Sequence, residues 1–214
     1  MLADVTGLIG VLVWPALVVF VVVLFRKPLN RLLSGSLTVK GPGGLEISAS
    51  SRQQAATALT QATVAKGAPP MDQQTALDHV DTAAQTLSAV GGRARVLWVD
   101  DHPSTNRHEV TAMEAVGIDV ELSPSTEDAL ERVQRNPAYD VIVSDMERLE
   151  HPQAGYDLLQ KLRAAGVHTP FVVYARSGRP EHFDEAVRHG AEGWADTPEE
   201  LMQMVLAAVR RVRG

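Results

Sequence analysis

The sequence predicts an α/β protein whose C-terminal part forms a five-stranded, doubly wound parallel sheet with helices on both faces. Beyond Gly92, short apolar runs alternate with amphipathic segments of helical spacing. The apolar runs are nearly continuous, which is typical of strands buried on both sides. Before this region we expect three further segments. An uncharged run predicts one transmembrane helix, an alternating segment predicts a short β-hairpin, and two helix-forming segments predict a helical linker.

Composition sets the first limits on function. The chain has 214 residues, of which 45% are hydrophobic, and this is typical of a folded protein with one ordinary domain and additional segments. A net charge of −6 disfavours a general nucleic-acid binder, which would carry clustered Lys and Arg. The absence of cysteine excludes a disulfide scaffold, a thiolate zinc site and a cysteine nucleophile.

The N-terminal residues 1–27 are predicted to form a membrane anchor. Residues 7–25 contain no charged side chain, and as a helix they would span about 28 Å, close to the ~30 Å hydrocarbon core of a bilayer. Asp4 precedes the run, whereas the basic residues Arg26 and Lys27 follow it. The positive-inside rule therefore predicts a single-pass protein of the inner membrane, with its N-terminus outside and its C-terminal domain in the cytoplasm.

Two alternatives to an anchor exist for the same run. A cleaved signal peptide would have a basic segment before its apolar core, and none is present here. A buried helix of a soluble protein would be interrupted by polar residues over this length.

Residues 36–48 are predicted to form a juxtamembrane β-hairpin. Apolar and polar residues alternate on both sides of Gly41–Gly44, a segment with the composition of a turn. Two roles remain open for a hairpin of this size, whose edges are unpaired. It rests on lipid headgroups or on the following domain, or it pairs with hairpins of other copies in a homo-oligomer.

Residues 49–92 are predicted to be a helical linker made of two helices, at 49–66 and 71–90. The first has only a weak apolar face. The second has an apolar stripe at helical spacing, formed by Leu77, Val80, Ala84 and Leu87. This stripe fits either a short coiled-coil seam or packing against the next domain.

Residues 93–214 are predicted to form the α/β domain from five strand–helix units. Ser125 or Thr126 is suited to cap the second helix, and Pro198 is suited to the first turn of the last one. We expect strands at 95–99, 118–122, 139–144, 171–174 and 192–195, and helices at 104–116, 126–135, 155–165, 181–189 and 198–212.

Three carboxylates follow predicted strands directly. Asp100 and Asp101 come after the first strand, and Asp145 comes after the third. The carboxyl ends of parallel strands meet at one edge of a sheet, where ligands bind. Like charges gathered there raise one another's pKa unless a cation is present, and oxygen ligands suit Mg²⁺. A carboxylate beside such a metal is suited to phosphoryl transfer, with Asp145 as the nucleophile.

Four segments carry a resemblance to a known family. VLWVDDHPSTN, VIVSDM, GYDLLQKLR and GAEGWADTPEEL resemble the receiver domain of bacterial two-component response regulators, and the likeness covers residues 94–212. It implies a flavodoxin-like sheet in the order 2-1-3-4-5. It also implies that Asp145 is the phospho-acceptor and that Asp100 and Asp101 are the acidic pair for Mg²⁺.

The resemblance implies roles for two more residues and shows two departures. Glu147 would lend its backbone carbonyl as a further metal ligand, and Trp194 stands where receivers have the aromatic residue that reorients on activation. However, Ala175 stands where receivers have Thr or Ser, and Thr197 stands where they have Lys. Loss of that cation removes a charge-assisted contact of about 1.5–3 kcal/mol.

Arg176 and Ser177 follow Ala175 directly and are further candidates for contact with a phosphoryl group. They would supply a guanidinium and a hydroxyl from a shifted backbone, or they are solvated loop residues. For the loop after Asp145, a surface position is favoured for Arg148.

Two functions are consistent with these residues. The first is a membrane-anchored signalling protein regulated by phosphorylation and Mg²⁺ at Asp145, acting through protein–protein interaction. The second is a degenerate receiver that is never phosphorylated and serves as a constitutive interaction or oligomerisation module. The expected partners are other signalling proteins, with a histidine kinase among them, the lipid bilayer and further copies of the chain, but no nucleic acid.

An enzyme or nucleotide-binding domain that uses the carboxylates on another ligand is the third class. No P-loop, G-x-G-x-x-G or G-x-S-x-G motif is present, so we expect the protein not to be an enzyme.

Overall fold

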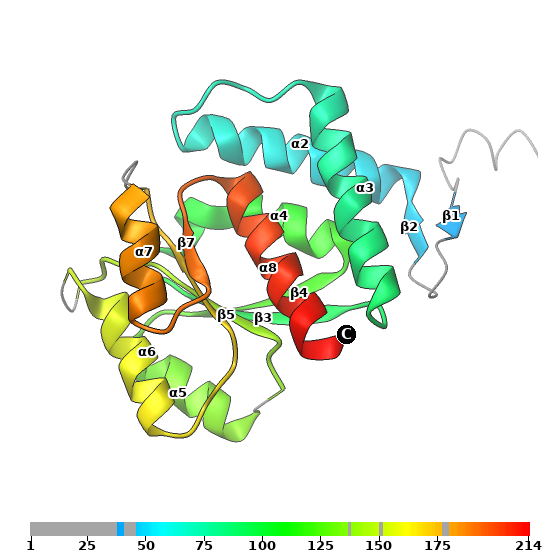
Figure 1. Cartoon of the computed structure of the whole chain (residues 1–214). Coiled ribbons are helices and arrows are strands. Elements are labelled where there is room, and N and C mark those ends of the chain that lie inside the picture. The colour runs from blue at the N-terminus through cyan, green and yellow to red at the C-terminus, as the bar shows by residue number, and fades with distance from the viewer. Residues whose placement is uncertain (1–37, 41–45, 137, 150–151, 177–179) are drawn as a thin grey trace, which may run out of the picture.

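A parallel five-stranded sheet lies at the centre of the C-terminal region, with the strand order β4-β3-β5-β6-β7 (Figure 1). Counted from the first strand of the domain, this is the predicted order 2-1-3-4-5. Neighbouring strands pair in parallel throughout. The strands are β3 (Ala94–Val99), β4 (Ile118–Ser123), β5 (Val141–Ser144), β6 (Phe171–Tyr174) and β7 (Gly193–Ala195).

The computed structural model describes residues 38–40, 46–136, 138–149, 152–176 and 180–214. The predicted anchor at residues 7–25 lies outside these ranges. Within them, no helix is both long enough and apolar enough to cross a membrane.

Helices cover both faces of the sheet, as predicted (Figure 1). One face is covered by α4 (Arg107–Val116) and α8 (Pro198–Arg213), and the other by α5 (Thr126–Arg135), α6 (Ala154–Ala164) and α7 (Pro180–Arg188). Successive strand residues point to opposite faces. The buried side chains therefore divide into two clusters, with Val96, Trp98, Val143 and Tyr174 towards α4 and α8 and Leu97, Ile142, Phe171 and Val173 towards the other helices.

The helix ends follow the local sequence. Ser125 caps α5 by accepting a hydrogen bond from the Asp128 N–H at 3.2 Å. Gly117 ends α4 with a φ of 102°, a conformation that favours glycine. The predicted helix at 104–116 is divided into a short 3-10 helix η1 (Pro103–Asn106) and α4, because Pro103 starts the first turn before the regular helix begins.

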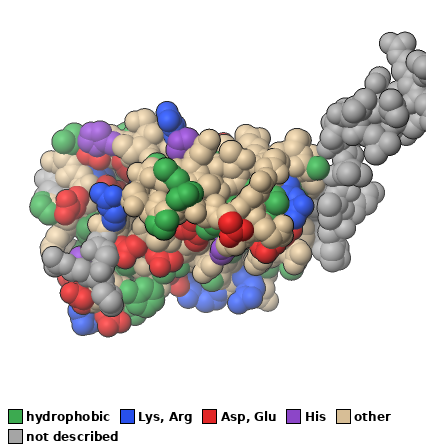
Figure 2. Space-filling view, turned by 90° about the horizontal axis from the view of Figure 1, so that it is seen from above, with side chains coloured by type: hydrophobic (Ala, Val, Ile, Leu, Met, Phe, Trp, Pro, Cys, Tyr) green, Lys and Arg blue, Asp and Glu red, His purple; other side chains and the backbone are tan. Residues whose placement is uncertain are grey.

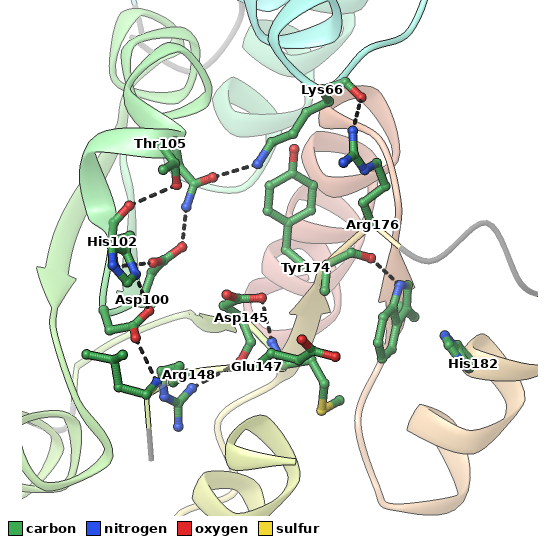
Figure 3. A pocket seen from close by; sticks show the side chains of 16 residues that line it. Lys66, Asp100, His102, Thr105, Asp145, Glu147, Arg148, Tyr174, Arg176 and His182 are labelled. Atoms are coloured by element: carbon green, nitrogen blue, oxygen red, sulfur yellow. Dashed lines mark hydrogen bonds and ion pairs between the residues drawn. The ribbon is translucent and has the colours of Figure 1, made fainter. Parts of the chain in front are cut away.

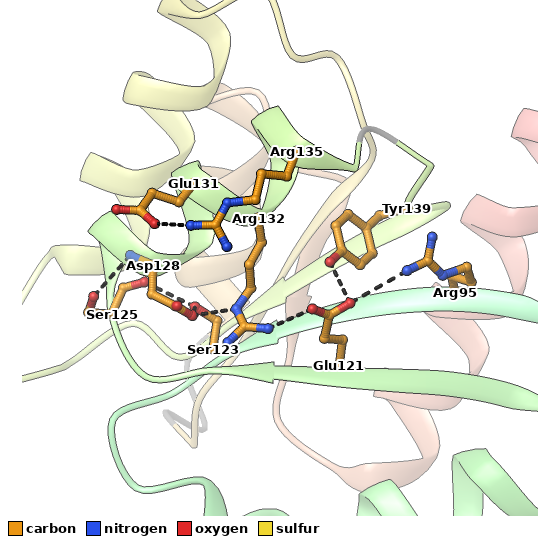
Figure 4. Close-up of polar contacts among 9 residues, drawn as sticks. All are labelled: Arg95, Glu121, Ser123, Ser125, Asp128, Glu131, Arg132, Arg135 and Tyr139. Atoms are coloured by element: carbon orange, nitrogen blue, oxygen red, sulfur yellow. Dashed lines mark hydrogen bonds and ion pairs between the residues drawn. The ribbon is translucent and has the colours of Figure 1, made fainter.

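Polar contacts join α5 to the outer strand β4 (Figure 4). Glu121 accepts hydrogen bonds from the Tyr139 hydroxyl and from Arg132 Nη1, both at 2.6 Å. Arg132 also donates to Asp128 at 2.5 Å. The hydrogen bond from Tyr139 and the charge of Arg132 hold the pKa of Glu121 below its usual value, and burial together with Glu121 raises the pKa of Tyr139 to about 12.

Before the α/β domain, the described residues form two short strands and two helices. β1 (Thr38–Lys40) pairs antiparallel with β2 (Glu46–Ser48), with Val39 opposite Ile47, which confirms the strand pairing that the alternation predicts. Then come α2 (Ala49–Ala65) and α3 (Gln73–Ala89).

α2 and α3 form a further helical layer over α4 and α8 (Figure 1). Leu59 of α2 and Val80 and Leu87 of α3 are buried in the same hydrophobic cluster as Trp98 of the sheet. Arg52 pairs with Asp81 across the two helices. Of the two roles considered for the stripe on α3, packing against the domain is therefore the one observed.

The buried face of α3 differs in detail from the predicted stripe. Ala76 and Ala83 are fully buried with Val80 and Leu87, whereas Leu77 and Ala84 are only half-buried. The contact is close because alanines lie at its centre. On the outward side, α2 exposes uncharged side chains such as Gln53, and uncharged surface predominates over this part of the molecule in Figure 2.

We expect Leu87→Ala to lower the free energy of unfolding by about 2–4 kcal/mol, because it leaves a cavity in the shared core. The measurement is urea unfolding of the detergent-solubilised full chain, followed by tryptophan fluorescence, since Trp98 lies in that core. Val64→Ala, at a half-exposed position on α2, is the control and should change stability by less than about 0.5 kcal/mol. Equal stability of Leu87→Ala and wild type would show that α3 is a detached linker.

Candidate functional site

An open cavity of about 860 Å³ lies at the carboxyl edge of the sheet. Its walls come from the loop after β3, the loop after β5, the end of β6, β7 and the C-terminal end of α2 (Figure 3). The lining residues are Lys66, Asp100, Asp101, His102, Thr105, Asn106, Asp145, Met146, Glu147, Arg148, Leu149, Tyr174, Ala175, Arg176, His182 and Trp194. The structure therefore brings together all three carboxylates that the sequence singled out.

Asp100 is held by the turn that follows it. Its side chain accepts hydrogen bonds from the His102 N–H at 2.6 Å and from Asn106 Nδ2 at 2.5 Å. Asp100 is 5% exposed and Asn106 is also buried. The carboxylate of Asp100 is thus fixed in place by local donors.

Asp101 bridges two loops of the cavity. Its Oδ2 accepts a hydrogen bond from the Leu149 N–H at 2.8 Å, and its Oδ1 lies 2.9 Å from His102 Nδ1. Burial alone would raise the pKa of Asp101, but the hydrogen bonds from Leu149 and His102 outweigh it, so the pKa lies below its usual value. Asp101 is accordingly ionised at neutral pH.

The pKa of Asp145, at the end of β5, is shifted in the opposite direction to that of Asp101. Burial, and after it the negative charge of Asp100, raise the pKa of Asp145 to about 6, although a hydrogen bond from the Met146 N–H at 2.7 Å acts in the other direction. Asp101 adds a smaller contribution in the same direction as Asp100. Ionised Asp145 is therefore destabilised by its surroundings, and a cation would relieve this repulsion.

The donor set fits a hard divalent cation. Ligand atoms of Asp100, Asp101 and His102 lie within 4.8 Å of one another. Asp145 and the exposed Glu147 line the same cavity but lie outside that group. Carboxylate oxygens, with room for retained water in an open cavity, are the environment that Mg²⁺ prefers.

The loop after Asp145 is fixed by Arg148. The surface position favoured for this residue is wrong, because Arg148 is only 6% exposed. Its guanidinium donates to Ser144 Oγ at 2.7 Å, Thr126 Oγ1 at 2.7 Å, the Ala154 carbonyl at 2.8 Å and the Asp145 carbonyl at 3.0 Å. The sequence does not reveal this burial, because the acceptor Thr126 lies 22 residues away along the chain.

Gly155 allows α6 to begin directly against the same loop. A Cβ atom at this position would lie 2.9 Å from the Asp145 carbonyl oxygen, which is closer than real contacts allow. Together, Arg148 and Gly155 define the backbone path beside the Asp145 side chain.

Ala175 and Trp194 are linked across β6 and β7. The indole Nε1 of Trp194 donates to the Ala175 carbonyl at 2.5 Å and to Asp196 Oδ1 at 2.9 Å, and the indole ring lies 4.8 Å from the ring of His182. Both Ala175 and Trp194 line the cavity, and Ala175 has no hydroxyl to offer there.

The remaining candidates for contact with a phosphoryl group are Arg176, Thr197 and Ser177. Arg176 donates from Nη1 to the Lys66 carbonyl at 2.9 Å, which directs its guanidinium to the end of α2. Thr197 is not part of the cavity lining and instead caps α8, where its hydroxyl accepts from the Glu200 N–H at 3.2 Å. Ser177 lies outside the described residues.

Asn106, Tyr174 and Lys66 are among the lining residues that the sequence does not mark as site candidates. Asn106 and Tyr174 are close in sequence to expected site residues, so their positions in the loop after β3 and at the end of β6 were a usable signal. Lys66 offered no such signal, because it belongs to the segment expected to be a linker.

A match to a family model identifies the family of this fold. Residues 96–208, more than half of the chain, match the response regulator receiver domain. The chain belongs to this receiver family. Among solved structures, the Francisella response regulator 1452 receiver domain is 26% identical with a TM-score of 0.51, over 56% of this chain and 99% of that chain. A two-component response regulator from Clostridium difficile shares the fold. It is 22% identical with a TM-score of 0.50, and the match covers 57% of this chain and 100% of that chain.

Two curated bacterial relatives match the receiver. A gliding motility regulatory protein of Myxococcus xanthus is 28% identical over 131 residues, which are 59% of this chain and 16% of that protein. The transcriptional regulatory protein RprY of Bacteroides fragilis is 28% identical over 125 residues, or 57% of this chain and 52% of that protein. The match thus spans about half or less of these relatives.

The raised pKa of Asp145 predicts a pH-dependent stability in the receiver without metal. The unfolded pKa is about 4, so the folded state binds more protons between about pH 4 and 6, and stability falls as the pH rises through this window. Asp145→Asn removes the charge and should raise the free energy of unfolding at pH 7.5 by about 1–3 kcal/mol, with little effect at pH 4. Urea unfolding in a chelator measures both values.

Asp119→Asn is the matched control for this experiment. Asp119 is exposed and pairs with Arg93 on the surface, so its replacement should change stability by less than about 1 kcal/mol at either pH. Parallel pH profiles of wild type and Asp145→Asn would contradict the assignment.

Proposed function

We propose that Asp145 accepts a phosphoryl group, with Mg²⁺ held by Asp100 and Asp101, and that its phosphorylation state regulates binding to other signalling proteins. The supporting observation is the position of Asp145, at the carboxyl end of β5 in a cavity shared with both other carboxylates. Burial and Asp100 raise its pKa, which marks it as the group that gains most from a cation. A histidine kinase is the proposed donor, and the role is regulatory rather than enzymatic.

The transfer itself requires little from the protein beyond position and charge. A carboxylate oxygen of Asp145 attacks phosphorus, and the bond from phosphorus to the donor breaks. Its electron pair leaves with the donor's imidazole nitrogen or, from acetyl phosphate, with acetate, and an acyl phosphate forms on Asp145. Mg²⁺, when bound, neutralises charge on the phosphoryl oxygens and on the neighbouring carboxylates. The Met146 N–H holds the attacking carboxylate at 2.7 Å, and Arg148 holds the backbone beside it.

The response to phosphorylation would pass through β6 and β7. Trp194 is half-buried at the cavity and hydrogen bonds to the Ala175 carbonyl, so movement of this strand end displaces the indole. Because Asp145, Ala175 and Trp194 line the same cavity, we propose that this pair transmits the state of Asp145 to a partner-binding face.

One observation favours a second candidate function. Ala175 offers no hydroxyl, and Thr197 is used as a helix cap, so neither residue supplies a phosphoryl contact from these positions. A receiver without these contacts would serve as a constitutive interaction or oligomerisation domain.

We expect the detergent-solubilised full chain, incubated with acetyl phosphate and Mg²⁺, to gain the mass of one phosphoryl group. Asp145→Asn should gain none, because the amide is not a nucleophile, and chelation of Mg²⁺ should slow the reaction by at least about tenfold. Intact-mass spectrometry measures the adduct, and treatment with hydroxylamine identifies an acyl phosphate.

Asp119→Asn is a suitable control, since Asp119 is an exposed acid that pairs with Arg93 on the surface. It should be phosphorylated as the wild type is. If wild type gains no phosphoryl group under conditions in which Mg²⁺ raises its melting temperature, the domain binds metal without being switched, and the constitutive function replaces the first.

We also propose that residues 7–25 anchor the receiver in the cytoplasmic membrane, with the N-terminus outside. The uncharged run and the basic residues after it support this. Val18→Arg with Val22→Arg should release the protein from membranes at alkaline pH, since each arginine costs about 2.5–3.5 kcal/mol at the centre of a span. Val64→Arg, on the exposed face of α2, should leave it in the pellet. Wild type that is extracted by alkaline carbonate would refute the anchor.

A further inference from the structure

One cationic side chain at the cavity on the carboxyl edge of the sheet belongs to a segment outside the matched family region. Three Lys or Arg side chains line the described part of this cavity, namely Lys66, Arg148 and Arg176. Lys66 follows the last turn of α2, whereas the family match begins at residue 96. Thr197, where receivers would have lysine, is occupied as a helix cap.

The two arginines are engaged elsewhere. Both terminal nitrogens of Arg148 donate to protein oxygens, and the side chain is buried; the acceptors belong to Ser144, Asp145, Thr126 and Ala154. Arg176 donates to the Lys66 carbonyl and thereby holds the end of α2 against the end of β6 (Figure 3). Arg148 reaches Asp145 at its backbone carbonyl, and Arg176 is directed at the end of α2. The ammonium of Lys66 is therefore the cation that we consider for contact with an added anion.

The ammonium of Lys66 points into the cavity from above Tyr174 (Figure 3). Lys66 Nζ lies 2.9 Å from Asn106 Oδ1, 3.6 Å from Glu109 Oε1 and 4.9 Å from the centre of the Tyr174 ring. Its side chain is 25% exposed, whereas that of its partner Glu109 is 1% exposed. Asn106 in turn donates to Asp100, which links Lys66 to the acidic group.

These contacts leave Lys66 able to exchange partners. Asn106 is a neutral acceptor, and Glu109 Oε1 already accepts the Tyr174 hydroxyl at 2.9 Å, so it keeps that donor if the ammonium moves. A lysine has three donors on a flexible stem, whereas a phosphoryl group brings about two negative charges. A charge-assisted contact to phosphoryl oxygen is stronger than one to an amide.

We propose that Lys66 contacts the phosphoryl group on Asp145, in place of a lysine before the last helix, and so couples α2 to the phosphorylation state. This inference rests on the proposed function of Asp145. On phosphorylation the ammonium leaves Asn106 for a phosphoryl oxygen, while Arg176 keeps its hydrogen bond to the Lys66 carbonyl. The end of α2 then becomes tied to the cavity by its side chain as well as by its backbone.

The test compares Lys66→Met and Lys66→Arg with wild type in the detergent-solubilised full chain. Lys66→Met keeps the length of the stem and removes the charge, and we expect phosphorylation by acetyl phosphate to slow by roughly 10- to 100-fold. Lys66→Arg keeps the charge and should restore the rate to within about threefold of wild type. Lys161→Met, an exposed lysine on α6, is the matched control and should behave as wild type.

A second measurement separates phosphoryl contact from a structural role. With Mg²⁺ and beryllofluoride, amide hydrogen exchange in the last turn of α2 should slow in wild type and in Lys66→Arg but not in Lys66→Met. The melting temperature of unphosphorylated Lys66→Met shows whether it is folded. Normal rates and normal protection in Lys66→Met, with wild type phosphorylated, would overturn the role of Lys66 alone. No phosphorylation of wild type would overturn the proposed function and, with it, this inference.

Discussion

The crowding of three carboxylates at one sheet edge is the constraint on which the cavity depends. β3 and β5 are neighbours in a parallel sheet, so Asp100 and Asp145 must meet where both strands end. Burial and the charge of Asp100 raise the pKa of Asp145, whereas local donors fix the Asp100 side chain and lower the pKa of Asp101. The surrounding residues stabilise these carboxylates with hydrogen bonds. Asn106 orients Asp100, the Leu149 N–H binds Asp101, and the resulting negative site favours a divalent cation.

The helical layer of α2 and α3 extends the receiver beyond the matched family region. Its apolar side chains share one core with the sheet, so these helices are part of the same folded unit. Their contact with the cavity is equally direct, because Lys66 and Arg176 both line it and Arg176 bonds to the Lys66 carbonyl. Thr63 of α2 also donates to Glu199 of α8 at 2.5 Å. A change at the carboxylates is thus adjacent to the segment that leads towards the N-terminus, and no long relay is needed.

The departures from the family pattern change how such a switch would work. Ala175 contributes its backbone carbonyl to Trp194 but no side-chain donor to the cavity, and Thr197 stabilises the start of α8. The two positions are therefore used for structure, and polar contact with an added group would come from elsewhere. The cationic side chains around the described cavity come from the end of α2 and from the loops after β5 and β6. The helical layer therefore contributes a cation to the site that the matched receiver region does not contain.

The sequence by itself determined the sheet, its order and the place of the acidic group. Buried parallel strands require continuous apolar runs, and their carboxyl ends must converge, so Asp100, Asp101 and Asp145 could be placed from spacing and resemblance. Only the tertiary structure decided where α2 lies, that Arg148 is buried and that Lys66 reaches the cavity. α2 is rich in alanine and weakly amphipathic, so its pattern carries no information about its partner. Contacts between distant segments depend on how their surfaces fit, which local periodicity does not encode.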